Sequence, residues 1–248
     1  MRYNTQGLRL AAIDIGSNAA RLLICNVIHT NKGNPEFIKL NLIRVPLRLG
    51  FDVFETGSIS VEKEVDIINM LQSFKYLMRL HDVNHYVACA TSAMREASNS
   101  EEIISRVCHL TEIDIKIISG KEEASSIFAN HIEKNLDKNQ SYLYIDVGGG
   151  STELILFNNN QPQFQESFDV GTIRMLKKKV TDKEWQRLKG FVREETSNYK
   201  NLFGIGSGGN INKISSLSKI KDGKPISLEI LNNYQEILSD MSIEDRMI

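Results

Sequence analysis

Asp14-Ile15-Gly16-Ser17-Asn18 is the stretch of sequence that decides the fold, because Asp146-Val147-Gly148-Gly149-Gly150-Ser151 repeats it later in the chain. Each stretch follows an apolar run typical of a strand and precedes another such run. The aspartate at the strand end can bind a metal, and the glycines after it allow backbone N–H groups to approach an anion. The two copies lie about one domain length apart. The repeat therefore predicts a duplicated fold with phosphate chemistry in the cleft between its halves.

The composition excludes several classes of protein. At 248 residues the chain is long enough for two domains. Its formal net charge of −1 gives no general attraction to nucleic acid, so a pocket is expected to recognise any phosphate. The 3 cysteines are odd in number and have no metal-site spacing, and the N-terminus carries no signal pattern. No apolar run approaches the roughly 18 residues that span a bilayer, so we expect a cytoplasmic protein without a membrane partner.

The first half of the chain is predicted to contain three strands, a helix, a strand, a helix and a strand. Short connections make the first three strands antiparallel neighbours. Apolar residues recur at three- and four-residue steps after Ser60, which is placed to cap a helix, and Asn99 with Glu102 resembles a capping pair. The expected strands are 10–15, 22–28, 37–49, 86–90 (buried) and 113–118, and the expected helices start at 61 and at 99 and end near 78 and 110.

The second half repeats this order of elements. A helix carrying Glu122 and Glu123 is expected from Gly120 to about Leu136, and the polar segment 137–141 is the expected linker. This gives an N-terminal domain 1–136 and a C-terminal domain 137–248. The second domain is one strand and one helix shorter, so we expect it to be incomplete, with an unpaired sheet edge. Its expected strands are 142–147, 154–157, 164–170 and 202–205, and its helices start near 181, 209 and 228.

Seven blocks occur in order along nearly the whole chain, at 14–18, 48–50, 90–99, 119–124, 146–153, 171–174 and 206–209. One such block alone is a weak signal, but seven in order are specific. With these blocks the chain resembles the exopolyphosphatase and guanosine pentaphosphate phosphohydrolase (Ppx/GppA) family, within the actin, hexokinase and Hsp70 (ASKHA) superfamily. The resemblance implies an α/β protein of two ribonuclease H-like, actin-like ATPase domains, each βββαβαβα, with the active site in the interdomain cleft.

The resemblance implies two catalytic residues, Glu123 as the base that activates a water and Arg95 as the group that engages the phosphate chain. A carboxylate near a water can take its proton during attack on phosphorus, and a planar guanidinium can bind two phosphate oxygens. Without the resemblance, a solvated glutamate at a helix start and a surface arginine are sufficient explanations. Glu122 is a rival to Glu123, because adjacent helix positions differ by about 100° and only one can face the cleft.

The resemblance also implies that Asp146 and Glu153 hold a divalent cation, Mg²⁺ or Mn²⁺. Both flank the second glycine hairpin, so their carboxylates can converge on a hard cation. Asp14 occupies the equivalent place in the first hairpin and could hold the metal directly or through water. A turn aspartate with an exposed strand glutamate is the structural alternative. The phosphate-binding candidates are Ser17, Asn18, Gly148, Gly149, Gly150, Ser151 and Gly208, with Arg21 and Arg174 as weaker ones, and a purely structural glycine turn is their alternative.

The function expected from these parts is the metal-dependent release of the terminal phosphate of inorganic polyphosphate. Guanosine pentaphosphate is the close alternative, because it also ends in a phosphoanhydride. A sugar or acetate kinase of the same fold, with an adenosine pocket near residues 206–209, and a ligand-binding regulator without turnover remain open. Two departures from the family are Ala19 in the first hairpin and the absence of the segments that follow residues 242–248 in its members. The resemblance and the unfinished sheet suggest a homodimer.

Overall fold

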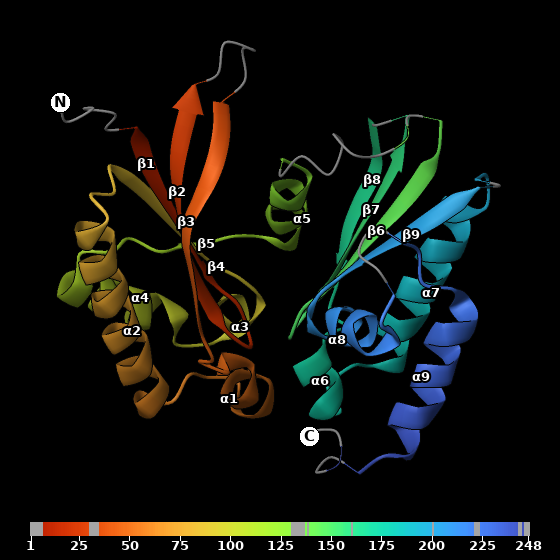
Figure 1. Ribbon diagram of the computed structural model, residues 1–248. Helices are drawn as coiled ribbons and strands as arrows, with labels where there is room; N and C mark the ends of the chain where they lie inside the picture. Colours follow the sequence, from red (N-terminus) through yellow and green to blue (C-terminus); the bar gives the residue numbers. More distant parts are fainter. Residues whose placement is uncertain are drawn as a thin grey trace.

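Two mixed sheets, one in each half of the chain, form the framework of the computed structural model (Figure 1). This arrangement confirms the predicted α/β class and the duplication. The expected domain boundary at 136/137 lies at the edge of a segment outside the described residues and stays a prediction. The structure describes residues 7–29, 35–129, 137, 139–159, 161–199, 201–220, 224–242 and 245.

The first sheet has the strand order β3-β2-β1-β4-β5. As predicted, its first three strands are antiparallel neighbours, and β4 and β5 join in parallel. The strand expected to reach Leu49 ends at Val45, because Pro46 has no N–H for the ladder. The strand expected over 113–118 is only two residues long, although Ile113 and Ile115 are buried in the core. The bounds are β1 Leu8–Ile15, β2 Ala20–His29, β3 Pro35–Val45, β4 His85–Ala90 and β5 Lys116–Ile117.

The helices of the first half include two short ones that the sequence did not predict, α1 and α3. The Ser60 hydroxyl caps α2 as expected, accepting a hydrogen bond from the Lys63 N–H at 3.3 Å. Asn99 occupies the N-cap position of α4 as predicted, but its side chain forms no capping bond and instead binds both backbone groups of Ile59. The start of β4 is exposed rather than buried. The bounds are α1 Leu49–Thr56, α2 Val61–Leu80, α3 Ser92–Glu96 and α4 Ser100–Thr111.

The second sheet has the order β8-β7-β6-β9, which repeats the order of the first four strands of the first sheet. Among the described residues no strand extends it beyond β9. The Thr181 hydroxyl caps α7 as predicted, and the short helix α6 was not predicted. The bounds are β6 Ser141–Val147, β7 Thr152–Asn158, β8 Gln161–Phe168, α6 Thr172–Leu176, α7 Asp182–Thr196, β9 Leu202–Ser207, α8 Gly209–Ser218 and α9 Leu228–Asp240.

Helices α2 and α4 lie on the outer side of the first sheet, and α7 and α9 lie on the outer side of the second (Figure 1). Apolar residues of α2 and α4, among them Phe74 and Ile103, pack on the first sheet in the larger core. Trp185 and Phe191 of α7 pack on the second sheet around Leu154 and Phe168. Within the described ranges, no helix is long and apolar enough to span a membrane. Cys25, Cys89 and Cys108 are free thiols, of which Cys25 is buried and the other two are partly buried.

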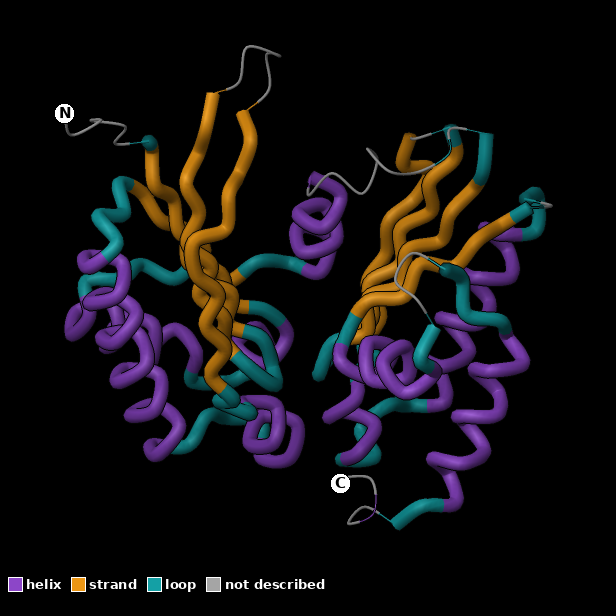
Figure 2. Tube along the Cα trace, in the orientation of Figure 1, coloured by secondary structure: helices purple, strands orange, loops and turns teal. Residues whose placement is uncertain are grey.

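Helix α5 (Gly120–Ala129) lies between the two sheets (Figure 2). Although it follows β5 of the first sheet, it packs against the second, where Ala124 is buried with Ile155 and Phe157. The remainder of the helix expected to reach Leu136 lies outside the described residues. The helix therefore joins the halves and carries Glu122 and Glu123 to the boundary between them.

Gly150 forms a close contact between the two halves. A methyl group in place of its α-hydrogen would lie 2.6 Å from Phe54 Cζ and 2.8 Å from Ser17 Oγ, and closer still to Ser92 Oγ. All three neighbours belong to the first half. Only a residue without a side chain fits at this point, so the second hairpin can sit directly against the first.

We expect Gly150→Ala to lower the free energy of unfolding by about 1–3 kcal/mol, because the added methyl overpacks a closed contact. Gly190→Ala is the matched control, since nothing lies within 4 Å of a methyl at that helical position. There we expect stabilisation by about 0.5–1 kcal/mol. Urea unfolding followed by circular dichroism measures both, and an unchanged Gly150→Ala midpoint would contradict the packing argument.

Candidate active site between the two hairpins

The two hairpins present equivalent positions with different charges. In the first, Asp14 is the cross-strand partner of Arg21, and their side chains form an ion pair at 3.1 Å. In the second, Asp146 is the cross-strand partner of Glu153. Like charges placed directly opposite each other on neighbouring strands are destabilising. The second hairpin therefore holds two carboxylates where the first holds a carboxylate and a guanidinium.

The hairpins lie against each other. A methyl on Gly149 would lie 3.2 Å from Ser17 Cβ and 3.3 Å from the Asn18 nitrogen, both in the first hairpin. The aspartates consequently act on each other. Burial raises the pKa of Asp14, Arg21 lowers it, and Asp146 raises it further. Burial also raises the pKa of Asp146, while a hydrogen bond from Ser207 and the charge of Arg21 lower it.

Glu123 lies in the first turn of α5, close to both hairpins. Its Oε2 atom is buried without a hydrogen-bond partner, and Arg95 Nη1 lies 3.9 Å from it. The pKa of Glu123 is raised to about 8, mainly by burial and then by the carboxylates of Glu153, Asp14 and Asp146, while Arg95 opposes the rise. The structure thus places a proton-accepting group among four charged side chains from both halves.

The Glu122 side chain points away from this cluster and caps the start of α5. Its Oε2 accepts hydrogen bonds from the N–H and the hydroxyl of Ser119, at 2.8 and 2.9 Å. Ser119 Oγ accepts one from the Glu122 N–H at 3.2 Å, which completes a reciprocal cap. These bonds and the ion pair with Lys116 lower the pKa of Glu122 to about 2. Of the two glutamates, Glu123 is therefore the one whose side chain faces the hairpins.

Arg95 is held at the end of α3 by the backbone. Its Nη1 donates a 2.6 Å hydrogen bond to the Ile118 carbonyl, the residue next to the cap of α5. Its side chain is 27% exposed, so its other N–H groups can reach a ligand. Because the carbonyl that holds Arg95 is neutral, the positive charge of the guanidinium remains able to attract an anionic ligand.

Serines from three segments hold the carboxylates of the second hairpin. Ser167 Oγ donates to Glu153 Oε1 at 3.0 Å, Ser151 also hydrogen-bonds Glu153, and Ser207 hydrogen-bonds Asp146. Burial nevertheless keeps the pKa of Glu153 above its usual value. Sequence reasoning missed the roles of Ser167 and Ser207. Ser207 stands beside a glycine block that could have drawn attention to it, whereas Ser167 carries no local signal.

The carboxylates suit a hard cation. In the part of the chain that the structure describes, no three His, Cys, Asp or Glu side chains lie close enough to form a metal site alone. Mg²⁺ commonly takes one or two carboxylates and fills its remaining positions with waters and substrate phosphates. The opposed pair Asp146 and Glu153, with Asp14 in their field, fits that pattern.

The predicted phosphate-binding residues differ in how free they are. The Ser17 hydroxyl is already paired with Ser92 Oγ at 2.7 Å and with the Ala93 N–H, whereas Asn18 is exposed. The Gly148 N–H is bonded to the Ser151 carbonyl. Gly208 has φ +111° and lies against the Val147 backbone, so it is fixed beside the second hairpin. Arg174 is not free either, because its guanidinium is bound to Glu96 and to the Gly150 carbonyl.

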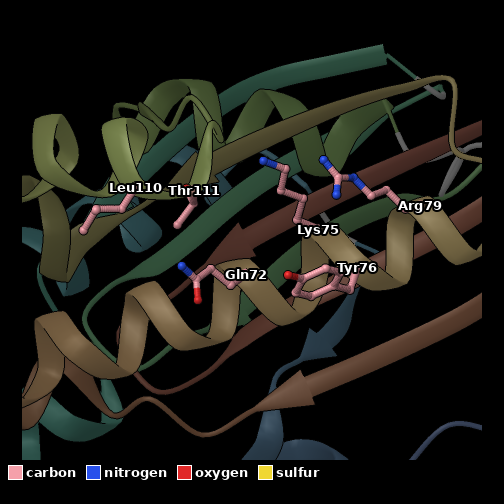
Figure 3. Close-up of a pocket in the computed structure, with 6 residues that line it drawn as sticks. All are labelled: Gln72, Lys75, Tyr76, Arg79, Leu110 and Thr111. Atoms are coloured by element: carbon pink, nitrogen blue, oxygen red, sulfur yellow. The ribbon is translucent and has the colours of Figure 1, made fainter.

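A separate pocket of about 140 Å³ lies on α2 and α4 (Figure 3). It does not include any residue of the carboxylate cluster. Lys75 at its rim is paired with Glu112. The lining residues are Gln72, Lys75, Tyr76, Arg79, Leu110 and Thr111.

Several curated proteins are similar to this chain. It is 30% identical over 180 residues to a bifunctional 3-dehydroquinate synthase/phosphatase of Fusobacterium nucleatum, covering 71% of this chain and 27% of that protein. It is 28% identical over 173 residues to a putative exopolyphosphatase of Haemophilus influenzae, covering 70% of this chain and 52% of that protein. Exopolyphosphatase 1 of Mycobacterium tuberculosis is 26% identical over 175 residues, with coverage of 71% and 50%. The chain thus spans about half the length, or less, of these relatives.

Two solved structures share the fold. An exopolyphosphatase from Cytophaga hutchinsonii superposes with a TM-score of 0.79 at 24% identity, over 96% of this chain and 82% of that one. A Ppx/GppA family member from Aquifex aeolicus gives a TM-score of 0.70 at 24% identity, over 96% and 81%. The sequence model of the Ppx/GppA phosphatase family matches residues 27–247. The chain therefore belongs to the Ppx/GppA phosphatase family, as its sequence motifs predicted.

Proposed function

We propose that the protein is a metal-dependent phosphohydrolase that releases the terminal phosphate of inorganic polyphosphate. One observation carries the proposal: Glu123 lies partly buried beside Arg95 and among the carboxylates of both hairpins, and its Oε2 atom is buried without a hydrogen bond. A carboxylate with a raised pKa and an oxygen that accepts no hydrogen bond is suited to exchange a proton near neutral pH. The family membership and the names of the exopolyphosphatase relatives support the choice of reaction.

In this mechanism a water attacks the terminal phosphorus while Glu123 takes its proton. The P–O bond to the rest of the chain breaks, and the negative charge moves to the departing phosphate oxygen. Arg95 lies beside the base and can stabilise charge on the phosphoryl group being transferred. Asp146 and Glu153 would hold Mg²⁺ or Mn²⁺, with Asp14 acting through a bound water, and the metal when bound would neutralise phosphate charge and orient the substrate.

Removal of the base should abolish turnover. We expect Glu123→Gln to lower kcat for phosphate release from polyphosphate by about 100- to 10,000-fold, the usual contribution of a general base. Glu122→Gln is the matched control, one residue away with its carboxylate on the α5 cap, and should retain activity near that of the parent.

The assay measures phosphate release from polyphosphate, guanosine pentaphosphate and ATP, with and without Mg²⁺. Comparable turnover by Glu123→Gln and the parent would exclude Glu123 as the base. Release from guanosine pentaphosphate but not from polyphosphate would replace the proposed substrate. Turnover of ATP only with an added sugar or carboxylate would indicate a kinase, and binding of all ligands without release would indicate a regulator.

The second hairpin should set the metal requirement. We expect Asp146→Asn to raise the Mg²⁺ concentration that gives half-maximal activity by about tenfold or more, because a neutral amide is a weaker ligand for a hard cation. Asp182→Asn is a comparison on the same half, since Asp182 lies in the first turn of α7 and outside the carboxylate cluster. Equal Mg²⁺ dependence of Asp146→Asn and the parent would remove Asp146 from the metal site.

The raised pKa of Glu123 should appear in the stability of the metal-free protein. Between its ordinary value of 4.5 and about 8, the folded chain keeps a proton that the unfolded chain releases, so the free energy of unfolding falls as pH rises. In EDTA, Glu123→Gln should match the parent near pH 4.5 and exceed it by about 1–3 kcal/mol at pH 8.5. Glu122→Gln should instead be less stable than the parent at pH 8.5, because the Glu122 pKa is lowered. Parallel urea-unfolding profiles of Glu123→Gln and the parent across this pH range would refute the shift.

A further inference from the structure

Arg174 lies where the two halves meet and is nearly enclosed, with 8% of its side chain exposed. All three nitrogens of its guanidinium are engaged. Nε donates a 2.8 Å hydrogen bond to the Gly150 carbonyl of the second hairpin. Nη1 donates to Glu96 Oε2 at 2.9 Å, and Nη2 is bound to Glu96 Oε1. The guanidinium also lies over the Phe54 ring, 4.2 Å from its centre.

These contacts connect parts of the candidate active site that the chain order separates. Gly150 belongs to the hairpin that carries Asp146 and Glu153. Glu96 is the next residue after Arg95 and ends α3. A single side chain therefore fixes the second hairpin to the helix that presents Arg95.

The backbone of α6 reinforces this connection. The N–H groups of Thr172 and Ile173 donate to the Gly148 and Gly149 carbonyls, at 3.0 and 2.9 Å. Ile173 is 4% exposed and packs within the core of the first half. Helix α6 is therefore hydrogen-bonded to the second hairpin and also packs, through Ile173, in the core of the first half. Arg174 lies at the junction of these two attachments.

We propose that Arg174 is a positioning residue, which holds the second hairpin and the Arg95 side chain in a fixed arrangement relative to each other. It does not touch substrate, because its donors are occupied. It acts through Glu96, whose bidentate pairing sets the end of α3 and hence the Arg95 guanidinium beside Glu123. A planar five-donor fork is required to bridge a carbonyl and a carboxylate together, and lysine cannot do this. The catalytic part of this inference rests on the proposed function.

A second ion pair across the same boundary serves as a matched control. Lys177, also in the α6 region, pairs with Glu55 at the end of α1. Its partner is 59% exposed, and among the described residues no side-chain hydrogen bond or ion pair joins Lys177 or Glu55 to the second hairpin or to α3. Loss of Lys177 removes a contact between the halves without removing the bridge to Gly150 and Glu96.

Hydrogen–deuterium exchange tests the connection without any ligand or turnover. In Arg174→Met we expect exchange to accelerate by about fivefold or more at two separate places. These are the amides of Arg95 and Ala97, bonded within α3, and the amide of Gly148, bonded across the hairpin. Arg174→Lys should behave like Arg174→Met, and Lys177→Met should leave both places unchanged. Unchanged exchange of α3 in Arg174→Met, or equal acceleration in Lys177→Met, would overturn the inference.

Kinetics with tripolyphosphate and Mg²⁺ tests the route through Arg95. We expect Arg174→Met to lower kcat/KM about tenfold or more, and Arg95→Met to lower it further. The double variant Arg95→Met/Arg174→Met should be no worse than Arg95→Met alone, because both changes remove the same arginine function. Additive losses would show that Arg174 acts independently and would overturn the inference. If the parent releases no phosphate, the proposed function fails while the exchange experiment still decides the positioning role.

Discussion

The direct contact between the two glycine hairpins is the constraint on which the site depends. Gly150 fits against Ser17, Phe54 and Ser92 only because it has no side chain. This closeness brings the Asp14 and Asp146 strand ends within each other's electrostatic field. Any residue larger than glycine would separate the halves and weaken the interaction between the carboxylates. The glycines of the second hairpin therefore allow the two halves to pack closely, as well as allowing a ligand to approach the backbone.

Four carboxylates with raised pKa values, Asp14, Glu123, Asp146 and Glu153, come together at this boundary. Such a cluster opposes folding unless protons, arginines or a cation compensate the charge. Ser167 donates a hydrogen bond to Glu153, and Ser207 lowers the pKa of Asp146, whereas the Oε2 atom of Glu123 has no hydrogen-bond partner and lies 3.9 Å from Arg95 Nη1. Asp146 and Glu153 thus have polar partners, whereas Glu123 has an oxygen that accepts no hydrogen bond and can exchange a proton. That division suits a site where a metal and a general base act together.

Sequence periodicity and the repeated Asp-Gly hairpins were sufficient to predict the duplicated fold and most strands. Short elements escaped, because α3 and α6 have five residues each and show no full period of helical burial. Asn99 has the composition of a helix cap, yet its amide binds Ile59, forty positions earlier in the chain, a partner that no local pattern indicates. For the same reason the family resemblance implied Glu123, but the residues alone did not tell whether Glu122 or Glu123 faces the cleft. Their directions depend on Ser119, Lys116 and the second sheet.

Because helix α5 follows the first sheet but packs on the second, folding of the second half during synthesis depends on the first half. The face of the second sheet that carries Tyr142, Ile155 and Phe157 is covered by Ala124, which precedes that sheet in the chain. During synthesis α5 leaves the ribosome before the strands it will cover. The larger core of the first half contains residues 11–115 apart from Ile173, so it can form first and present α5 as a template. The later strands then emerge beside a surface already shaped to receive them, which shortens the time that their apolar face spends in water.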